Sequence, residues 1–176
     1  MLIHRYRHRV RYRECDPMGV VYHTHYLDHF EAARTEALRE MGLAYTELEA
    51  AGIIMPVIDL AVQYKGSARY DDLLEVTTTF VGGVPRVRVR IEYEVRRVGE
   101  PEVLVTGHVT LCFFSVARKR PIPAPPAVVE VFERALAAVS SPALSPPRCR
   151  SPRTSPTPLS TTSSRAPLPK TWDRAT

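Results

Sequence analysis

The feature that most constrains the fold is a segment in which apolar and charged residues alternate without interruption. Between residues 86 and 95, five apolar side chains alternate with five charged ones: Val87, Val89, Ile91, Tyr93 and Val95 against Arg86, Arg88, Arg90, Glu92 and Glu94. A period of two places successive side chains on opposite faces of a β-strand. One buried face and one solvated face are typical of an antiparallel sheet that is covered on one side.

Similar segments surround this one and are joined by short turns. We predict strands at about 54–65, 73–82, 86–98 and 102–117. Their separators are rich in Gly, Pro and Ser, which is the chemistry of turns: Gly66-Ser67, Gly82 to Pro85, and Gly99 to Pro101.

The first residues of the chain alternate as well. Residues 2–13 carry arginine at every odd position from 5 to 13, and the opposite side carries His4, Tyr6, His8, Val10 and Tyr12. We therefore expect a strand with one packed face and one arginine-lined face. The arginines are interpreted as a solvated face opposite acidic residues, with binding of substrate phosphates as the alternative.

One long helix is predicted to begin at about Tyr26 and to end at Gly42. Its apolar positions form a single stripe at helical spacing: Tyr26, Phe30, Ala33, Ala37 and Met41. A shorter helix is expected at about 45–51, and a last amphipathic helix follows the prolines after residue 120. One long helix among five strands indicates an α+β fold in which the curved sheet covers the helical stripe.

The net charge of +5 comes entirely from one end of the chain. Residues 1–139 carry 18 basic and 18 acidic side chains, whereas residues 140–176 carry six basic side chains and one acidic. That second segment is rich in Pro, Ser and Thr and poor in apolar residues, so we expect a disordered tail. A linker, an interaction arm or a product of the wrong reading frame are alternative interpretations of it.

Several classes of protein are not favoured by this sequence. No segment approaches the ~18 apolar residues of a membrane span, and the first ten residues lack the apolar core of a secretory signal. The three cysteines are far apart, which favours a reducing, cytoplasmic setting: Cys15, Cys112 and Cys149. The balanced charge of residues 1–139 argues against nucleic acid as a partner.

The segment before the long helix combines an acidic residue with a bend and a helix start. Pro17 favours an extended Asp16, and Gly19 permits a sharp bend. A helix N-terminus near His23 offers unpaired N–H groups that can polarise a carbonyl, and an upstream carboxylate can act as base or nucleophile. Taken alone, an Asp followed by Pro and Gly before a helix is far more often a turn or cap residue than a catalytic one. His23 and His25 would point apart on a helix, which disfavours a metal pair.

At these residues the sequence resembles a known family. The run from Tyr12 to Leu27, followed by Phe30 to Arg34, is similar to the signature of hot-dog-fold acyl-CoA thioesterases. The nearest class is that of the 4-hydroxybenzoyl-CoA thioesterases, including the Tol–Pal-associated acyl-CoA thioesterases. The resemblance extends to about Pro126, so residues 1–139 are expected to form a hot-dog thioesterase domain followed by the tail.

The resemblance implies a five-stranded antiparallel sheet wrapped around the long helix, in a homodimer or a dimer of dimers (a tetramer). Asp16 matches the catalytic Asp of the family, as nucleophile or as general base for water. His23 matches the residue whose backbone N–H contacts the thioester carbonyl, and its side chain is also expected to assist. Gly19, Tyr22 and Tyr26 are expected to border the substrate. No metal and no redox cofactor are expected.

CoA carries phosphates, so basic residues should border its site. The cluster Arg118-Lys119-Arg120 is the favoured candidate, with Lys65, Arg86 and Arg88 as others. Tyr64 and Met55 are assigned to either the acyl pocket or the core. Glu31 is a further candidate for a catalytic carboxylate, although an ion pair with Arg34 is the simpler interpretation.

The sequence thus predicts an enzyme that hydrolyses acyl-CoA to a carboxylic acid and free CoA. A dehydratase or hydratase on acyl-carrier protein or enoyl-CoA is the first alternative, because Asp16 and His23 could act as acid and base. A non-enzymatic module that binds acyl-CoA, or a basic nucleic-acid-binding protein, is the second.

Overall fold

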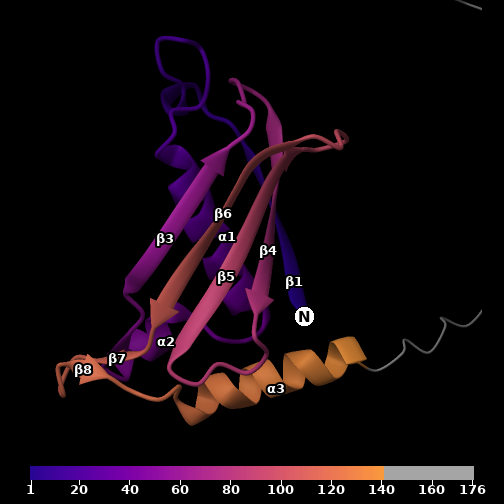
Figure 1. Cartoon of the computed structure of the whole chain (residues 1–176). Helices are drawn as coiled ribbons and strands as arrows, with labels where there is room; N and C mark the ends of the chain where they lie inside the picture. Colours follow the sequence, from indigo (N-terminus) through magenta and orange to yellow (C-terminus); the bar gives the residue numbers. More distant parts are fainter. Residues whose placement is uncertain (141–176) are drawn as a thin grey trace, which may run out of the picture. The chain divides into compact units, whose positions relative to one another are not determined.

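The structure, a computed structural model, describes residues 1–140 (Figure 1). The predicted disordered tail lies outside the described residues except for Ser140. The predicted boundary at residue 139 therefore stays a prediction. Within the described part, no helix is both long enough and apolar enough to span a membrane.

A five-stranded antiparallel sheet forms the centre of the described chain. Its strands lie in the order β1, β4, β5, β6, β3, and every neighbouring pair is antiparallel. The predicted alternation is confirmed within β5, because Ile91 and Val95 are fully buried while Arg90 and Glu92 are exposed. It does not hold at Val87, which precedes the strand and is 38% exposed. The strand bounds are Leu2–Arg9 (β1), Val57–Tyr64 (β3), Leu73–Val81 (β4), Arg88–Arg97 (β5) and Val103–Cys112 (β6).

The arginines of β1 lie on the solvent face, as the first interpretation expected. Arg5 and Arg7 reach the carboxylate of Glu75 on β4 at 3.7 and 3.3 Å. The strand ends earlier than predicted, at Arg9. The alternating pattern continues to residue 13, but Tyr12–Glu14 form a 3-10 turn (η1), in which the Glu14 N–H donates to the Arg11 carbonyl.

Helix α1 (His25–Glu40) packs against one face of the sheet. Its predicted apolar stripe is confirmed, since Phe30, Ala33 and Ala37 are almost completely buried. The Phe30 ring stacks on Tyr93 of β5 at a centroid distance of 4.2 Å. Gly107 of β6 permits this approach, because a Cβ there would lie 2.8 Å from the Phe30 ring and 2.8 Å from the Ala61 carbonyl.

Two predicted strands are interrupted. The segment 54–65 breaks at Pro56, which has no N–H for a ladder hydrogen bond, and the segment 102–117 breaks at Phe113, whose N–H donates to Val87. The residues cut off in this way form a second, three-stranded sheet in the order β2, β7, β8. Its strands are Ile53–Ile54 (β2), Phe114–Ser115 (β7) and Arg120–Pro121 (β8).

The two smaller helices agree with the predicted positions. Helix α2 (Tyr45–Ala50) follows α1, and helix α3 (Pro126–Ser140) ends the described chain. Val128 and Phe132 of α3 are buried, and the Phe132 ring meets Phe80 of β4 edge to face at 5.4 Å. Helix α3 therefore closes one end of the core that the sheet and α1 build.

Candidate functional site

Asp16 begins a narrow hairpin between η1 and α1, at the top of Figure 1. The Gly19 N–H donates to the Asp16 carbonyl at 2.9 Å, and the Asp16 N–H donates to the Val20 carbonyl at 2.9 Å. Pro17 presets the second position of this turn. Gly19 has φ of +75°, a left-handed conformation that glycine adopts without strain. The bend predicted at Gly19 is therefore present.

The carboxylate of Asp16 is held at one oxygen and open at the other. The Met18 backbone N–H donates to Oδ1 at 2.8 Å. Oδ2 has no hydrogen-bond partner in the part of the chain that the structure describes, and the residue is partly exposed. An oriented carboxylate with one unoccupied oxygen can attack a carbonyl carbon or accept a proton from water.

The start of α1 presents backbone N–H groups beside this hairpin. The Tyr22 N–H donates to the Glu14 carbonyl, and the His25 N–H donates to the Tyr22 carbonyl, both at 2.9 Å. Within residues 1–140, no partner accepts the N–H groups of His23 and Thr24. Such groups carry the partial positive charge of a helix N-terminus and can stabilise a developing oxyanion.

Tyr64, at the last residue of β3, fixes the position of this helix start. Its hydroxyl donates to the His23 carbonyl at 3.0 Å, and the two rings meet edge to face at 6.2 Å. Tyr64 is 48% exposed, so it belongs to the site surface rather than to the core. Met55, which was also assigned to either the acyl pocket or the core, packs against the core.

The other predicted site residues of this segment divide between surface and interior. Tyr22 and His23 are exposed and their rings lie 4.3 Å apart. Tyr26 is 2% exposed, and its hydroxyl accepts the Ala68 N–H at 3.1 Å. Within residues 1–140, no hydrogen bond or ion pair joins Asp16 to His23. Their roles in catalysis and substrate binding stay predictions.

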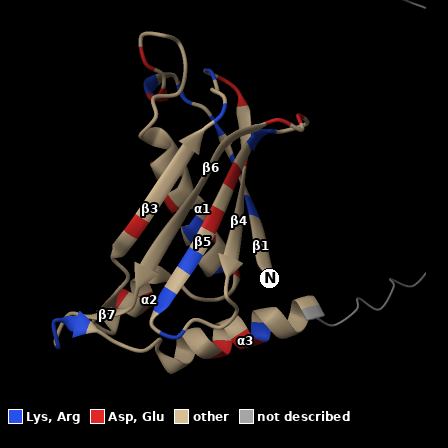
Figure 2. Ribbon diagram, in the orientation of Figure 1, with Lys and Arg blue, Asp and Glu red and all other residues tan. Residues whose placement is uncertain are grey.

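The basic candidates for CoA phosphates lie at two different ends of the sheet (Figures 1 and 2). Lys65 directly follows Tyr64 and is exposed at the Asp16 end. Arg86 and Arg88 lie at the opposite end, before and at the start of β5. The hairpin between β7 and β8 carries Arg118, Lys119 and Arg120 and forms a blue tip at that same far end in Figure 2. A single chain therefore does not bring this cluster to Asp16.

Glu31 forms the ion pair with Arg34 that was its simpler interpretation. It is exposed on α1, and its carboxylate accepts a hydrogen bond from Arg34 at 3.4 Å. His25 is likewise engaged, since its Nδ1 lies 2.9 Å from the Asp28 carboxylate on the same helix turn.

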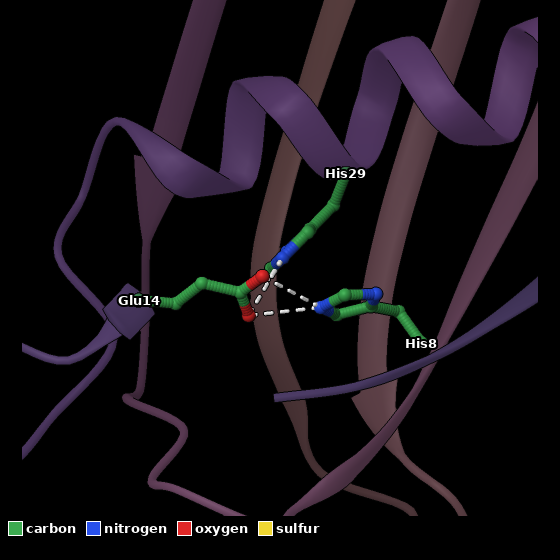
Figure 3. A group of neighbouring side chains, drawn as sticks. All are labelled: His8, Glu14 and His29. Atoms are coloured by element: carbon green, nitrogen blue, oxygen red, sulfur yellow. Dashed lines mark hydrogen bonds and ion pairs between the residues drawn. The ribbon is translucent and has the colours of Figure 1, made fainter. Parts of the chain in front are cut away.

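A group that sequence reasoning missed lies directly behind the hairpin: His8 of β1, Glu14 of η1 and His29 of α1 (Figure 3). The His8 Nε2 lies 2.8 and 3.1 Å from the two carboxylate oxygens of Glu14. The His29 Nε2 lies 3.7 Å from Oε2 of the same carboxylate. No spacing motif links positions 8, 14 and 29, so only the fold brings them together.

Burial and the neighbouring polar groups together set the ionisation of Glu14 and His29. Burial alone would raise the pKa of Glu14, but the Arg11 N–H and His8 outweigh it and lower the pKa of that carboxyl. Burial, with repulsion from His8, lowers the pKa of His29 to about 4. Glu14 is therefore ionised and His29 neutral at neutral pH. These three residues are the ones in the described chain that could hold a metal ion.

Comparison with known proteins agrees with this geometry. The chain is 35% identical over 126 residues to the acyl-CoA thioesterase YbgC of Haemophilus influenzae, which covers 70% of this chain and 90% of that protein. It is 39% identical over 69 residues to a putative acyl-CoA thioesterase, YneP, of Bacillus subtilis, which covers 39% of this chain and 50% of that protein. The chain spans only about half the length of some curated relatives that it matches.

A solved structure has the same fold. The DHNA-CoA thioesterase of Staphylococcus aureus superposes with a TM-score of 0.71 and 32% sequence identity, over 79% of this chain and 94% of that one. The predicted hot-dog arrangement, a five-stranded antiparallel sheet packed on a long helix, is thus confirmed. The model of the thioesterase-like superfamily matches residues 10–132, and the chain therefore belongs to that superfamily.

Proposed function

We propose that this protein hydrolyses acyl-CoA thioesters to a carboxylic acid and free CoA. The observation that carries the proposal is the Oδ2 of Asp16 on a hydrogen-bonded hairpin, followed within a few residues by N–H groups at the start of α1, all without a partner among residues 1–140. Acyl transfer needs these two parts, a carboxylate that attacks or activates water and donors for the oxyanion. The names of the YbgC and YneP relatives support the same substrate class.

The proposed chemistry uses groups of this chain alone. The backbone N–H of His23 donates to the thioester carbonyl oxygen and makes the carbon more electrophilic. Asp16 either attacks that carbon or removes a proton from the attacking water. The tetrahedral intermediate then expels the CoA thiolate, which takes up a proton. If Asp16 is the nucleophile, water hydrolyses the resulting acyl-aspartyl anhydride and releases the carboxylic acid. The ring of His23 is the candidate group for assisting these proton transfers. Neither a metal nor a redox cofactor takes part in this scheme.

Asp16→Asn tests the proposal. The amide oxygen of asparagine can still accept the Met18 N–H, so the hairpin is retained, but the side chain is neither a base nor a nucleophile. We expect kcat to fall by roughly 1,000-fold, measured with a thiol reagent over acyl-CoA substrates of increasing chain length. The hydrodynamic size and the circular dichroism should not change.

Asp71→Asn provides the matched control. Asp71 is an exposed carboxylate with φ of +69°, a conformation that asparagine tolerates, and it pairs with Arg9. This variant should hydrolyse acyl-CoA at the wild-type rate. Near wild-type turnover in Asp16→Asn would overturn the proposal, and addition of water to crotonyl-CoA by the wild type would favour the hydratase alternative.

We further propose that the working unit is a homodimer formed along β3. This strand is the last of the sheet, and its second edge has no partner strand within the described chain. Its apolar side chains are unusually open, with Ile58 at 45% and Leu60 at 43% exposure. An exposed apolar edge strand invites pairing with another strand. A tetramer built from two such dimers stays a prediction.

Such a dimer would also complete the substrate site. The Tyr64 end of β3 lies at His23, whereas its Val57 end lies beside the short sheet of β7 and β8. Antiparallel pairing of two β3 strands about a twofold axis places the Val57 end of one copy beside the Tyr64 end of the other. The basic hairpin at residues 118–120 of one copy would then approach Asp16 of its partner and could bind CoA phosphates there.

Charged side chains on the β3 edge test this dimer. The double variant Ile58→Lys, Leu60→Lys places like charges across the twofold axis, and we expect a monomer by light scattering with at least a tenfold lower kcat/KM. Val98→Lys, an exposed valine in the turn after β5, is the control and should remain wild-type in both measurements. A monomeric wild type, or a fully active double variant, would contradict the proposed interface.

We place the reaction in the cytoplasm. The support is the state of two cysteines in the described chain, Cys15 and Cys112, which are both free thiols. Free thiols are typical of a reducing compartment. Retention of the protein with a cytosolic marker during fractionation of its host cells is the expected result.

A further inference from the structure

We propose that His8, Glu14 and His29 form a binding site for one divalent transition-metal ion, of which Zn²⁺ is the best fit. Two imidazoles and one carboxylate make up a donor set that Zn²⁺ favours in proteins. The site is separate from the proposed reaction at Asp16, and it departs from the sequence-based expectation that this chain binds no metal. It does not depend on the proposed hydrolase activity.

The distances between donor atoms suit such an ion. In a tetrahedral site with bonds of about 2.0–2.1 Å, neighbouring donors lie roughly 3.3 Å apart. The His8 Nε2 lies 2.8 Å, and the His29 Nε2 3.7 Å, from Oε2 of Glu14, and all three donors lie within 4.8 Å of one another. The two contacts to Glu14 are therefore within about 0.5 Å of the required spacing, and the ring nitrogens of His8 and His29, at most 4.8 Å apart, would move toward each other when an ion binds.

His29 provides the independent evidence for a ligand. Its side chain is 3% exposed, yet neither ring nitrogen has a hydrogen-bond partner among the described residues. Buried polar atoms are rarely left without a partner, because the desolvation cost is then not offset. Figure 3 shows the His29 ring directed at the Glu14 carboxylate, which the His8 ring of β1 also contacts. A metal ion between them would provide the missing partner for His29.

The surroundings of the three side chains provide further elements of a metal site. The Arg11 N–H donates to Oε2 of Glu14 at 2.9 Å and orients the carboxylate, as outer-shell hydrogen bonds do in metal sites. A cavity of about 280 Å³ is lined by the three side chains of the cluster and also by Arg11, Arg13, His25 and Asp28. This space gives an ion a route of entry and room for water as a fourth ligand.

The three ligands come from three separate elements. His8 lies on β1, Glu14 in η1 two residues before Asp16, and His29 on the first turns of α1. An ion bound here would join the edge strand, the hairpin and the helix that together position the proposed reactive groups. We therefore assign it a structural role, as a clamp on the hairpin.

Titration of the full-length protein with Zn²⁺ and with Co²⁺ tests the site. The protein is first treated with a chelator and desalted. We expect one Zn²⁺ per chain with a Kd of about 1 µM, a higher Tm at saturating Zn²⁺, and visible d–d absorption on addition of Co²⁺. His29→Gln should weaken Zn²⁺ binding at least about 100-fold, more than the loss of an outer-shell partner does.

The control variant is His108→Gln. His108 also lies 2.8 Å from a carboxylate, that of Asp59, but this contact is solvent-exposed and has no third metal-ligating side chain beside it among the described residues. It should bind Zn²⁺ like the wild type. His8→Gln provides a second test if His29→Gln does not fold. A wild type without Zn²⁺ binding below about 100 µM, or equal affinity in folded His29→Gln or His8→Gln, for example through thiols, would overturn the proposal.

Discussion

Glu14 and Asp16 are two residues apart on one loop, yet their carboxylates have opposite surroundings. Glu14 is 6% exposed and is held by His8 and by the Arg11 N–H, whereas Asp16 is partly exposed and one of its oxygens has no partner within the described chain. A buried, fully oriented carboxylate stabilises the loop. An open one on a rigid turn is available for a substrate. The difference shows how one short segment can separate a supporting role from a reactive one.

The sharpest test of this comparison is the stability of two variants. Glu14→Ala leaves the His8 ring and the Arg11 N–H without the carboxylate that they contact, and we expect the free energy of unfolding to fall by about 3 kcal/mol, as when buried hydrogen-bonding groups lose their partner. Asp16→Asn should change it by less than about 0.5 kcal/mol. Urea denaturation with a chelator present measures both. Equal losses in the two variants would remove the distinction between these carboxylates.

The pH dependence of stability tests the buried surroundings of Glu14, through its neighbour His29. The folded pKa of His29 is about 4, below its usual value near 6.5, so the unfolded chain binds a proton first as the pH falls. Stability is therefore lost between about pH 6.5 and pH 4. For this one group the loss between pH 7.5 and pH 5 is about 2 kcal/mol.

His29→Gln should lack that part of the pH dependence. Its neighbours still titrate, so the wild type and the variant are compared by how steeply the free energy of unfolding changes with pH, and not by its absolute value. Metal-free wild type and variant are unfolded with urea at several pH values. Parallel curves for the two proteins would show that burial does not hold His29 neutral.

Tyr64→Phe tests the exposed site around Asp16. The change removes the hydrogen bond from the Tyr64 hydroxyl to the His23 carbonyl and should lower kcat/KM by about fivefold, the equivalent of one hydrogen bond of about 1 kcal/mol. Tyr70→Phe is the control, because Tyr70 is also exposed and its hydroxyl makes no hydrogen bond within the described chain. Equal activity in both variants would show that the position of the helix start does not matter.

The smallest expected effect concerns Lys65. If this exposed cation at the Asp16 end contacts a phosphate of CoA, Lys65→Gln should raise KM for acyl-CoA two- to threefold, because solvent-exposed ion pairs contribute up to about 1 kcal/mol. The same variant should hydrolyse an acyl-pantetheine, which lacks the nucleotide phosphates, like the wild type. An equal rise in KM for both substrates would exclude a phosphate contact.

Much of the sheet could be predicted because alternation reports burial directly. The pattern at residues 86–95 predicted which side of β5 is buried, and the spacing from Tyr26 to Ala37 predicted the buried side of α1. The short sheet of β2, β7 and β8 could not be predicted, since two residues are too few to show a period. The break at Pro56 follows from its missing N–H, whereas the break at Phe113 depends on a hydrogen bond to the distant Val87.

The candidate site divides in the same way. Asp16 and Gly19 act through local turn chemistry, so the bend was predictable from adjacent residues. His8 was predicted to lie on the packed face of β1, and it does, but the residues that it would meet there were not predictable. Its proximity to Glu14 and His29 results from the crossing of β1 and α1. Likewise, residues 118–120 were identified as basic, but not their place at the far end of the sheet.

The strand order has a consequence for how the chain folds during synthesis. Leu2 pairs with Phe80, and Phe30 packs on Tyr93 and beside Gly107, so the first strand and the long helix depend on residues made much later. Closing such long loops before any contact forms slows folding. The first 40 residues therefore leave the ribosome with their apolar stripe uncovered. The molecule can assemble only once β5 and β6 have emerged.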